Sequence, residues 1–149
     1  MIDAEQKFEE FLRSKELKYS LERKLILKSA FSFHKHFNAD DLFDRLRKHS
    51  NHVSRATIYR TIPLLLQSGL IGEALRCRDK KSYEIIFNKK HHDHLLCVKC
   101  GKTIEFYNEG IEKLQNEVCR KYNFTPLEHR LGIKGYCKDC YKKIKEEGK

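Results

Sequence analysis

The sequence predicts an α+β protein of two parts, an N-terminal winged helix-turn-helix domain and a C-terminal α/β domain. Three observations lead to this prediction. Apolar residues recur at helical spacing as far as Gly69, and capping residues mark where helices begin. Two short extended runs follow, as in a β-hairpin. Strand-like and helical segments then alternate around two Cys-x-x-Cys pairs. The first domain should span residues 1–87 and the second residues 88–149, with a hinge near 87–91.

Capping residues predict the starts of three helices that follow a first helix near the N-terminus. Ser20, Asn38 and Ser54 each precede a run with helical periodicity, and their side chains can accept a hydrogen bond from the first turn. Asp41 falls at the third helical position after Asn38, and Phe37 and Leu42 are placed to form a hydrophobic staple. The helix that begins after Ser54 contains Pro63, which removes one backbone hydrogen bond and should kink it.

Extended runs predict the strands. Residues 70–76 and 82–87 should form the hairpin, joined by a polar turn at 77–81. In the C-terminal half, strands are expected at 92–98, 103–106 and 127–136, with a helix between the second and third. A soluble, lysine-rich tail is expected to end the chain.

Charge and composition narrow the class of protein. Lys and Arg outnumber Asp and Glu by 31 − 21 = 10 in 149 residues, which favours a polyanionic partner such as nucleic acid or an anionic membrane. The N-terminus is polar, and no apolar stretch reaches the length of a membrane span. We therefore expect a soluble protein of the reducing cytoplasm with no membrane partner. In that compartment cysteines act as metal ligands more often than as disulfides.

The two Cys-x-x-Cys pairs are the strongest signal in the sequence. Cys97 and Cys100 form the first pair, followed by Gly101, and Cys137 and Cys140 form the second. Each pair can place two sulfurs on one ion, and two pairs complete the tetrahedral thiolate shell of a structural Zn²⁺. Two disulfides, or a redox-active pair, are the alternative.

The run His91-His92-Asp93-His94 predicts two further metal sites. On an extended strand His92 and His94 point to one face, and His91 and Asp93 to the other. Mixed histidine and carboxylate ligands suit Fe²⁺, Mn²⁺ or Zn²⁺. A solvated polar strand and a catalytic metal site are the alternatives. The other candidate ligands are His36, Glu84, Glu105, Glu112 and His129.

The helix that begins after Ser54 has the composition of a DNA-recognition helix. Arg55 and Arg60 can contact guanine or phosphate, and Thr57 and Tyr59 can contact thymine methyls or phosphates. An ordinary amphipathic surface helix would show a similar pattern. The excess positive charge and the hairpin beyond the helix favour DNA.

Three segments, residues 56–60, 91–106 and 137–140, together resemble the ferric uptake regulator family, and the similarity covers nearly the whole chain. The resemblance implies a dimeric, metal-responsive transcription factor. Its winged-helix domain would bind double-stranded operator DNA, and its C-terminal domain would form the homodimer. An ion at the hinge would fix the angle between the domains.

The resemblance also implies residue roles. The regulatory site would be formed by His36, Glu84, His92, His94 and Glu105. A second metal site would be formed by His91, Asp93, Glu112 and His129. Tyr59 and Arg60 would face the major groove and Lys18 would enter the minor groove. The full set expected to contact DNA is Lys18, Arg23, Ser54, Arg55, Thr57, Tyr59 and Arg60.

The expected function is metal-dependent regulation, most simply repression, with no catalysis. Fe²⁺ is the first choice of effector, with Mn²⁺ also compatible. Zinc sensing is second, and peroxide sensing is third because Glu84 and Glu105 stand where peroxide sensors of the family usually carry Asp. A zinc-dependent hydrolase and a zinc-ribbon module that binds RNA or protein are the alternatives from other classes.

Overall fold

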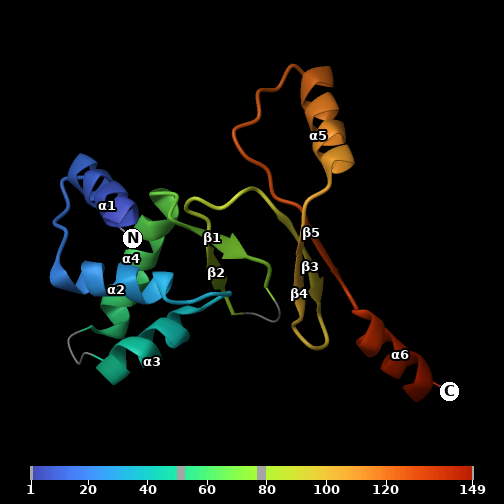
Figure 1. The fold of residues 1–149 in the computed structure, drawn as a ribbon, viewed down its shortest axis with the longest axis horizontal. Helices are drawn as coiled ribbons and strands as arrows, with labels where there is room; N and C mark the ends of the chain where they lie inside the picture. Colours follow the sequence, from blue (N-terminus) through green and yellow to red (C-terminus); the bar gives the residue numbers. More distant parts are fainter. Residues whose placement is uncertain (1, 50–52, 77–79, 149) are drawn as a thin grey trace. The chain divides into compact units, whose positions relative to one another are not determined.

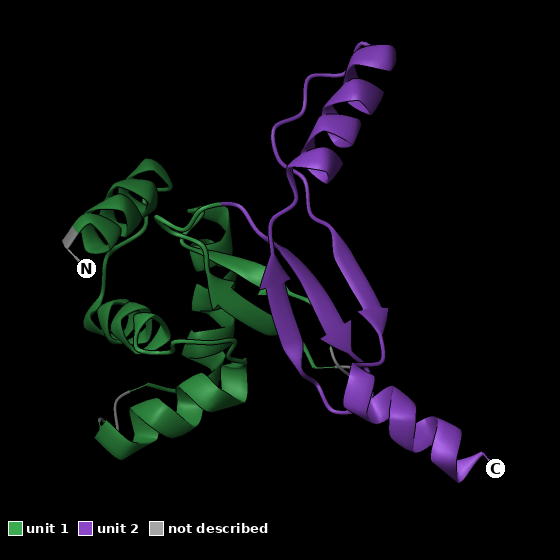
Figure 2. Cartoon of the chain, turned by 45° about the vertical axis from the view of Figure 1, so that its right-hand side comes forward, with its two compact units in different colours: residues 1–90 green, residues 91–149 purple. Residues whose placement is uncertain are grey.

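The computed structural model describes residues 2–49, 53–76 and 80–148. The chain divides into two compact units, residues 1–90 and 91–149 (Figure 2). The boundary between them falls within the segment expected as a hinge. The mixture of helices and sheet agrees with the predicted α+β class. None of the helices in the described ranges has the length and apolar character needed to cross a membrane.

Unit 1 is a helical bundle followed by a two-stranded antiparallel sheet (Figure 1). Its buried side chains form one core, with Phe8, Leu27 and Leu65 fully buried at its centre. The elements are α1 (Ile2–Ser14), α2 (Leu21–Phe31), α3 (Ala39–His49), α4 (Arg55–Gln67), β1 (Ile71–Ala74) and β2 (Ser82–Ile85).

The predicted capping residues begin the helices as expected. The Ser54 hydroxyl accepts a hydrogen bond from the Thr57 amide at 3.1 Å, and Ser20 caps α2 in the same way. The Asn38 side chain accepts from the Asp41 amide at 2.9 Å, while the Asp41 carboxylate accepts from the Asn38 amide at 2.8 Å. This reciprocal pair is a capping box.

Gly69 ends the recognition-helix candidate α4 and turns the chain into the hairpin. Its φ of 69° lies in the left-handed region, where glycine carries no steric penalty. The strands of the hairpin are shorter than predicted, and turn residues 77–79 lie outside the described residues. Helix α4 continues through Pro63 to Gln67, so the proline lies inside the helix as expected.

A short bridge extends the hairpin sheet on one side. Phe37 and Tyr83 exchange two backbone hydrogen bonds, of 2.9 and 2.7 Å, in an antiparallel bridge. The segment between α2 and α3 therefore lies beside β2. Because the bridge is antiparallel, it sets His36 opposite Glu84.

Unit 2 contains a three-stranded sheet in the order β4-β3-β5. Strand β3 pairs antiparallel with β4 and parallel with β5. Of the strand expected at 127–136, only the four residues of β5 form a strand. The prediction of a lysine-rich tail is wrong, because the C-terminal lysines lie in helix α6. The elements are β3 (Asp93–Cys97), β4 (Thr103–Phe106), α5 (Glu109–Lys121), β5 (Gly132–Gly135) and α6 (Lys138–Glu147).

Helix α5 is amphipathic but none of its residues is buried. Leu114, Val118 and Tyr122 follow one another at intervals of four residues and are 57–71% exposed. Asn108 caps the helix through the Ile111 amide at 3.1 Å. The helix therefore forms from local signals but leaves its apolar face uncovered in a single chain.

Candidate metal centres and nucleic-acid interface

The four predicted cysteines converge in unit 2, and their sulfur atoms all lie within 4.8 Å of one another. Cys97 ends β3, and Gly101 closes the turn after Cys100 with a φ of 76° and a hydrogen bond to the Cys97 carbonyl. Cys137 and Cys140 lie at the start of α6. No disulfide joins any of these four thiols.

The spacing of the sulfurs fits Zn²⁺. A tetrahedral site with Zn–S bonds of about 2.3 Å separates its sulfurs by about 3.8 Å. Cys100 Sγ lies 3.8 Å from Cys137 Sγ. Hydrogen bonds from the backbone of Cys100 and Cys137 lower the pKa of the Cys97 thiol to about 6. Burial, together with hydrogen bonds to the neighbouring cysteines, raises the pKa of Cys140. Such crowded thiols become thiolates together when they bind a cation.

The second predicted metal site is also assembled within unit 2. His91 Nε2 lies 3.3 Å from Asp93 Oδ1 and 3.4 Å from Glu112 Oε1, and His129 Nε2 lies 3.2 Å from Glu112 Oε2. Ligands at about 2.1 Å from an ion are separated by about 3.0 to 3.4 Å in octahedral or tetrahedral geometry. The four residues therefore fit a divalent cation.

Burial of Asp93 supports this assignment. Its side chain is 1% exposed, Oδ1 accepts a hydrogen bond from the Leu131 amide, and Oδ2 has no hydrogen-bond partner among the described residues. A buried carboxylate oxygen without a partner is costly, and a bound cation removes that cost.

The residues of the expected regulatory site fall into two groups, one in each unit. In unit 1, His36 Nε2 lies 3.6 Å from Glu84 Oε2, and Glu84 is 6% exposed. In unit 2, His94 and Glu105 are direct partners across β3 and β4, and His92 Nε2 lies 3.9 Å from Glu105 Oε1. Each group brings a histidine together with a carboxylate.

Helix α4 buries one face and exposes the other. Tyr59 is 59% exposed and Arg60 is also exposed, whereas Ile58, Ile62 and Leu65 are buried against the core of unit 1. Small and polar residues at the start of the helix therefore face solvent, as a helix that enters a DNA groove requires.

The other residues expected to contact DNA make contacts within unit 1. The Ser54 and Thr57 hydroxyls lie 2.9 Å apart at the helix start, so both take part in capping α4. Arg23 donates a hydrogen bond to the backbone carbonyl of Lys18, whose side chain is exposed. Arg23 thus supports the loop that carries Lys18.

No pattern in the sequence indicates the partner of Arg55. The Arg55 guanidinium pairs with the Asp40 carboxylate and lies over the Phe43 ring, with Cζ 4.1 Å from the centroid. This hydrogen bond from Arg55 is the main reason that the pKa of Asp40 is lowered. Fifteen residues separate the two charges, so only the packing of α3 against α4 brings them together.

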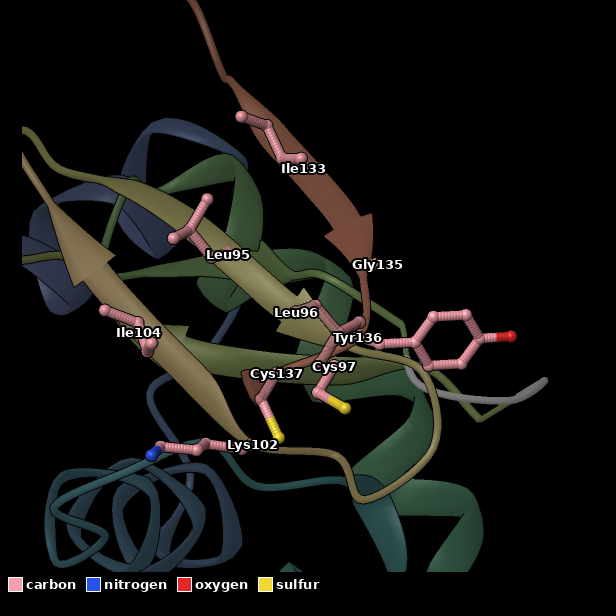
Figure 3. Close-up of a pocket in the computed structure, with 9 residues that line it drawn as sticks. All are labelled: Leu95, Leu96, Cys97, Lys102, Ile104, Ile133, Gly135, Tyr136 and Cys137. Atoms are coloured by element: carbon pink, nitrogen blue, oxygen red, sulfur yellow. The ribbon is translucent and has the colours of Figure 1, made fainter. Parts of the chain in front are cut away.

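One face of the unit 2 sheet carries an uncovered apolar row. Leu95 is the register partner of Ile104 on β4 and of Ile133 on β5, and the three are 36–49% exposed. They line a pocket of about 170 Å³ that extends to Tyr136 and the cysteine cluster (Figure 3). This row and the exposed face of α5 are two apolar surfaces of the unit, and Phe124 and Leu127, between α5 and β5, are also exposed.

Comparison with known proteins identifies the family. A model of the ferric uptake regulator family matches residues 14–134. The ferric uptake regulation protein of Campylobacter upsaliensis is 34% identical over 142 residues, covering 94% of this chain and 90% of the relative.

Solved structures give the same result. The ferric uptake regulator of Helicobacter pylori, whose structure reveals three functional metal-binding sites, superposes with a TM-score of 0.74 at 29% identity, covering 87% of this chain and 86% of that one. The regulator of Pseudomonas aeruginosa with manganese superposes with a TM-score of 0.73 at 30% identity, over 85% and 95% of the chains. The chain therefore belongs to the ferric uptake regulator family of metal-responsive regulators.

Proposed function

We propose that the chain is a homodimeric transcriptional repressor that binds palindromic operator DNA when Fe²⁺ occupies a hinge site. The division of the regulatory ligands carries this proposal. His36 and Glu84 belong to unit 1, whereas His92, His94 and Glu105 belong to unit 2. An ion bound by both groups would stabilise one relative orientation of the units, by its higher affinity for that orientation.

The zinc site has a different role in this proposal. A closed shell of four thiolates leaves no position for an exchangeable ligand, so Zn²⁺ there would stabilise unit 2 rather than report metal levels. This fits the position of the cysteines, which connect the end of β3 to the first turn of α6. An ion at the site of His91, Asp93, Glu112 and His129 would add stability, because its ligands come from both α5 and the strand region.

A second copy of the chain is the proposed partner for the apolar surfaces of unit 2. The exposed row of Leu95, Ile104 and Ile133 and the uncovered face of α5 are too apolar to remain in water without cost. A two-fold dimer would bury both, and would present two copies of α4 to successive major grooves of a palindrome.

The residues proposed to contact DNA lie on the exposed surface of α4 and the loop before α2. Tyr59 and Arg60 would enter the major groove from the exposed face of α4, and Lys18 would reach the adjacent minor groove from a loop supported by Arg23. Ser54 and Thr57 would hold the first turn of the helix in place. The net charge of +10 would favour association with DNA.

The effector is proposed to be Fe²⁺ because related proteins are named for ferric uptake, and because mixed histidine and carboxylate ligands accept it readily. Mn²⁺ and Zn²⁺ are the competing effectors, since one related structure contains manganese and another is a zinc-bound manganese uptake regulator. A peroxide response is the third alternative.

A metal titration of DNA binding tests the proposal. Duplexes would first be selected from a random library on the manganese-loaded protein, and the affinity of the selected duplex would then be measured after mild chelation and after addition of Fe²⁺ (anaerobically), Mn²⁺ or Zn²⁺. We expect a palindromic consensus and a roughly 5- to 150-fold gain in affinity with the effector. Binding that ignores sequence, or that is unchanged by chelation, would contradict the proposal and favour a non-specific zinc-ribbon module.

A further inference from the structure

The Asp40 carboxylate pairs with two cations of the proposed DNA-binding face, one on each side. Oδ1 accepts the hydrogen bond from Arg55, at the first position of α4, and Oδ2 lies 3.6 Å from Lys80 Nζ at the end of the hairpin turn. Asp40 itself is in the first turn of α3. One carboxylate thus connects the helix before α4, α4 itself and the hairpin.

The Arg55 guanidinium is held on two sides. Its edge faces the Asp40 carboxylate and its plane lies over the ring of Phe43, one turn further along α3. A planar cation in contact with both an anion and an aromatic face loses most of its rotational freedom. Yet Arg55 keeps 54% of its side-chain surface exposed, so it remains accessible to a ligand.

The same carboxylate borders an open hollow between α4 and the hairpin. This hollow has a volume of about 500 Å³, and Tyr59, Lys80 and Lys81 are among its lining residues. DNA that contacts α4 and the hairpin would pass this hollow. Asp40, like Glu73 in the same lining, therefore places a negative charge beside the lysines that would attract a polyanion.

We propose that Asp40 is a specificity-determining positioning residue, which fixes Arg55 in one orientation and limits the attraction of this face for DNA of any sequence. The inference rests on the proposed DNA-binding function. Phosphate contacts raise affinity without regard to sequence, so restraint of Arg55 and Lys80 lowers non-specific binding. The fixed orientation of Arg55 preserves its contact in the correctly bound complex.

The test compares Asp40→Asn with the matched control Asp44→Asn. Asp44 is exposed on the same helix and makes no ion pair with any described residue, so both variants change the net charge equally. Affinity for the selected duplex and for a scrambled duplex of about 30 base pairs, long enough for two half-sites, would be measured across a range of salt concentrations.

For Asp40→Asn we expect one additional phosphate contact per protomer on the scrambled duplex. The log–log salt slope should steepen by about 0.9 per protomer, or about 1.8 for the dimer. The affinity of Asp40→Asn relative to the wild-type protein should therefore be about 60-fold greater at 0.1 M salt than at 1 M salt. The ratio of specific to non-specific affinity should fall. In an Arg55→Gln background most of this effect should disappear, because the released cation is no longer present.

Three results would overturn the inference. The first is that Asp40→Asn and Asp44→Asn show the same salt slope and the same specificity ratio. The second is that the effect of Asp40→Asn persists in full in the Arg55→Gln background. The third is that Asp40→Asn binds both duplexes equally more weakly and has a lower melting temperature than the wild-type protein. If Asp40→Asn does not fold, the Arg55→Lys variant tests the inference instead. Lys keeps the positive charge but cannot make the planar contacts of the guanidinium with Asp40 and Phe43, so it should reduce specificity without changing the salt slope. Failure of the wild-type protein to prefer the selected duplex would instead reject the proposed function.

Discussion

Replacement of Glu112 by Gln should remove the stabilisation that a divalent metal gives to unit 2. Glu112 is the residue of α5 that reaches the second site, with its two oxygens 3.4 Å from His91 Nε2 and 3.2 Å from His129 Nε2. Because α5 has no buried residue, these contacts are its main tertiary attachment in a single chain. Gln keeps the size of the side chain but loses the negative charge that a cation requires.

The expected magnitude follows from binding linkage. At a free Mn²⁺ concentration of about 100 times Kd, binding stabilises the folded state by about 2.7 kcal/mol. Loss of one charged ligand should weaken binding by at least the roughly 10- to 100-fold that follows loss of a residue that only orients ligands. At the same Mn²⁺ concentration the weakened site still gives about 0.4 to 1.4 kcal/mol, so the metal-dependent increment in unfolding free energy should fall by about 1.3 to 2.3 kcal/mol.

Urea unfolding with and without Mn²⁺, with the zinc site loaded throughout, would measure this increment. Hydrogen exchange of the α5 amides would show whether the lost stability is localised there. Glu117→Gln, on the exposed side of the same helix, is the matched control and should change stability by less than about 0.5 kcal/mol. Equal metal increments in Glu112→Gln and Glu117→Gln would refute the assignment of this site.

Three further outcomes are expected. Ser54→Ala and Asn108→Ala each remove a helix cap with a 3.1 Å hydrogen bond and should cost about 1 kcal/mol in urea unfolding, but only Ser54→Ala should also weaken DNA binding, about fivefold. Equal loss of DNA affinity in both would count against a role for α4. Cys100→Ser should lose bound zinc, measured by atomic emission, and should unfold unit 2; a folded, zinc-loaded variant would contradict the thiolate site. Ile133→Asp should shift the protein from dimer to monomer in analytical ultracentrifugation, and an unchanged dimer would exclude the sheet face as the interface.

Features that depend on neighbouring residues were predictable from sequence. The caps at Ser20, Asn38 and Ser54 each need only the amide three residues ahead, so a pattern of adjacent residues predicts them. Gly69 and Gly101 likewise mark turns through their own backbone conformation. The winged-helix order and the paired cysteines followed from these local signals.

Features that depend on tertiary contacts were not predictable in the same way. Helix α6 was expected as a tail because of its many lysines, and its N-cap residue, Cys137, makes no side-chain capping hydrogen bond. Part of its support is the pair between Lys99 and Glu147, which are 48 residues apart. Local propensity carries no information about such a contact.

The metal sites likewise combine ligands that neighbouring residues predict with ligands that only the tertiary structure brings together. Alternation along an extended chain places His91 and Asp93 together, and the structure shows the two 3.3 Å apart. Spacing alone cannot show that Glu112 on α5 and His129 before β5 reach the same point, and only the family resemblance suggested it. The contact between Asp40 and Arg55 had neither kind of signal.

The most direct test of the account is whether ligands from both units are required for metal-dependent DNA binding. His36→Ala removes a proposed ligand of unit 1 and His92→Ala one of unit 2, while His34→Ala, an exposed neighbour, is the control. We predict that His36→Ala and His92→Ala each abolish the roughly 5- to 150-fold gain in duplex affinity on metal addition, whereas His34→Ala retains it and all three keep the structural zinc. Full metal-dependent affinity in either His36→Ala or His92→Ala would contradict the account.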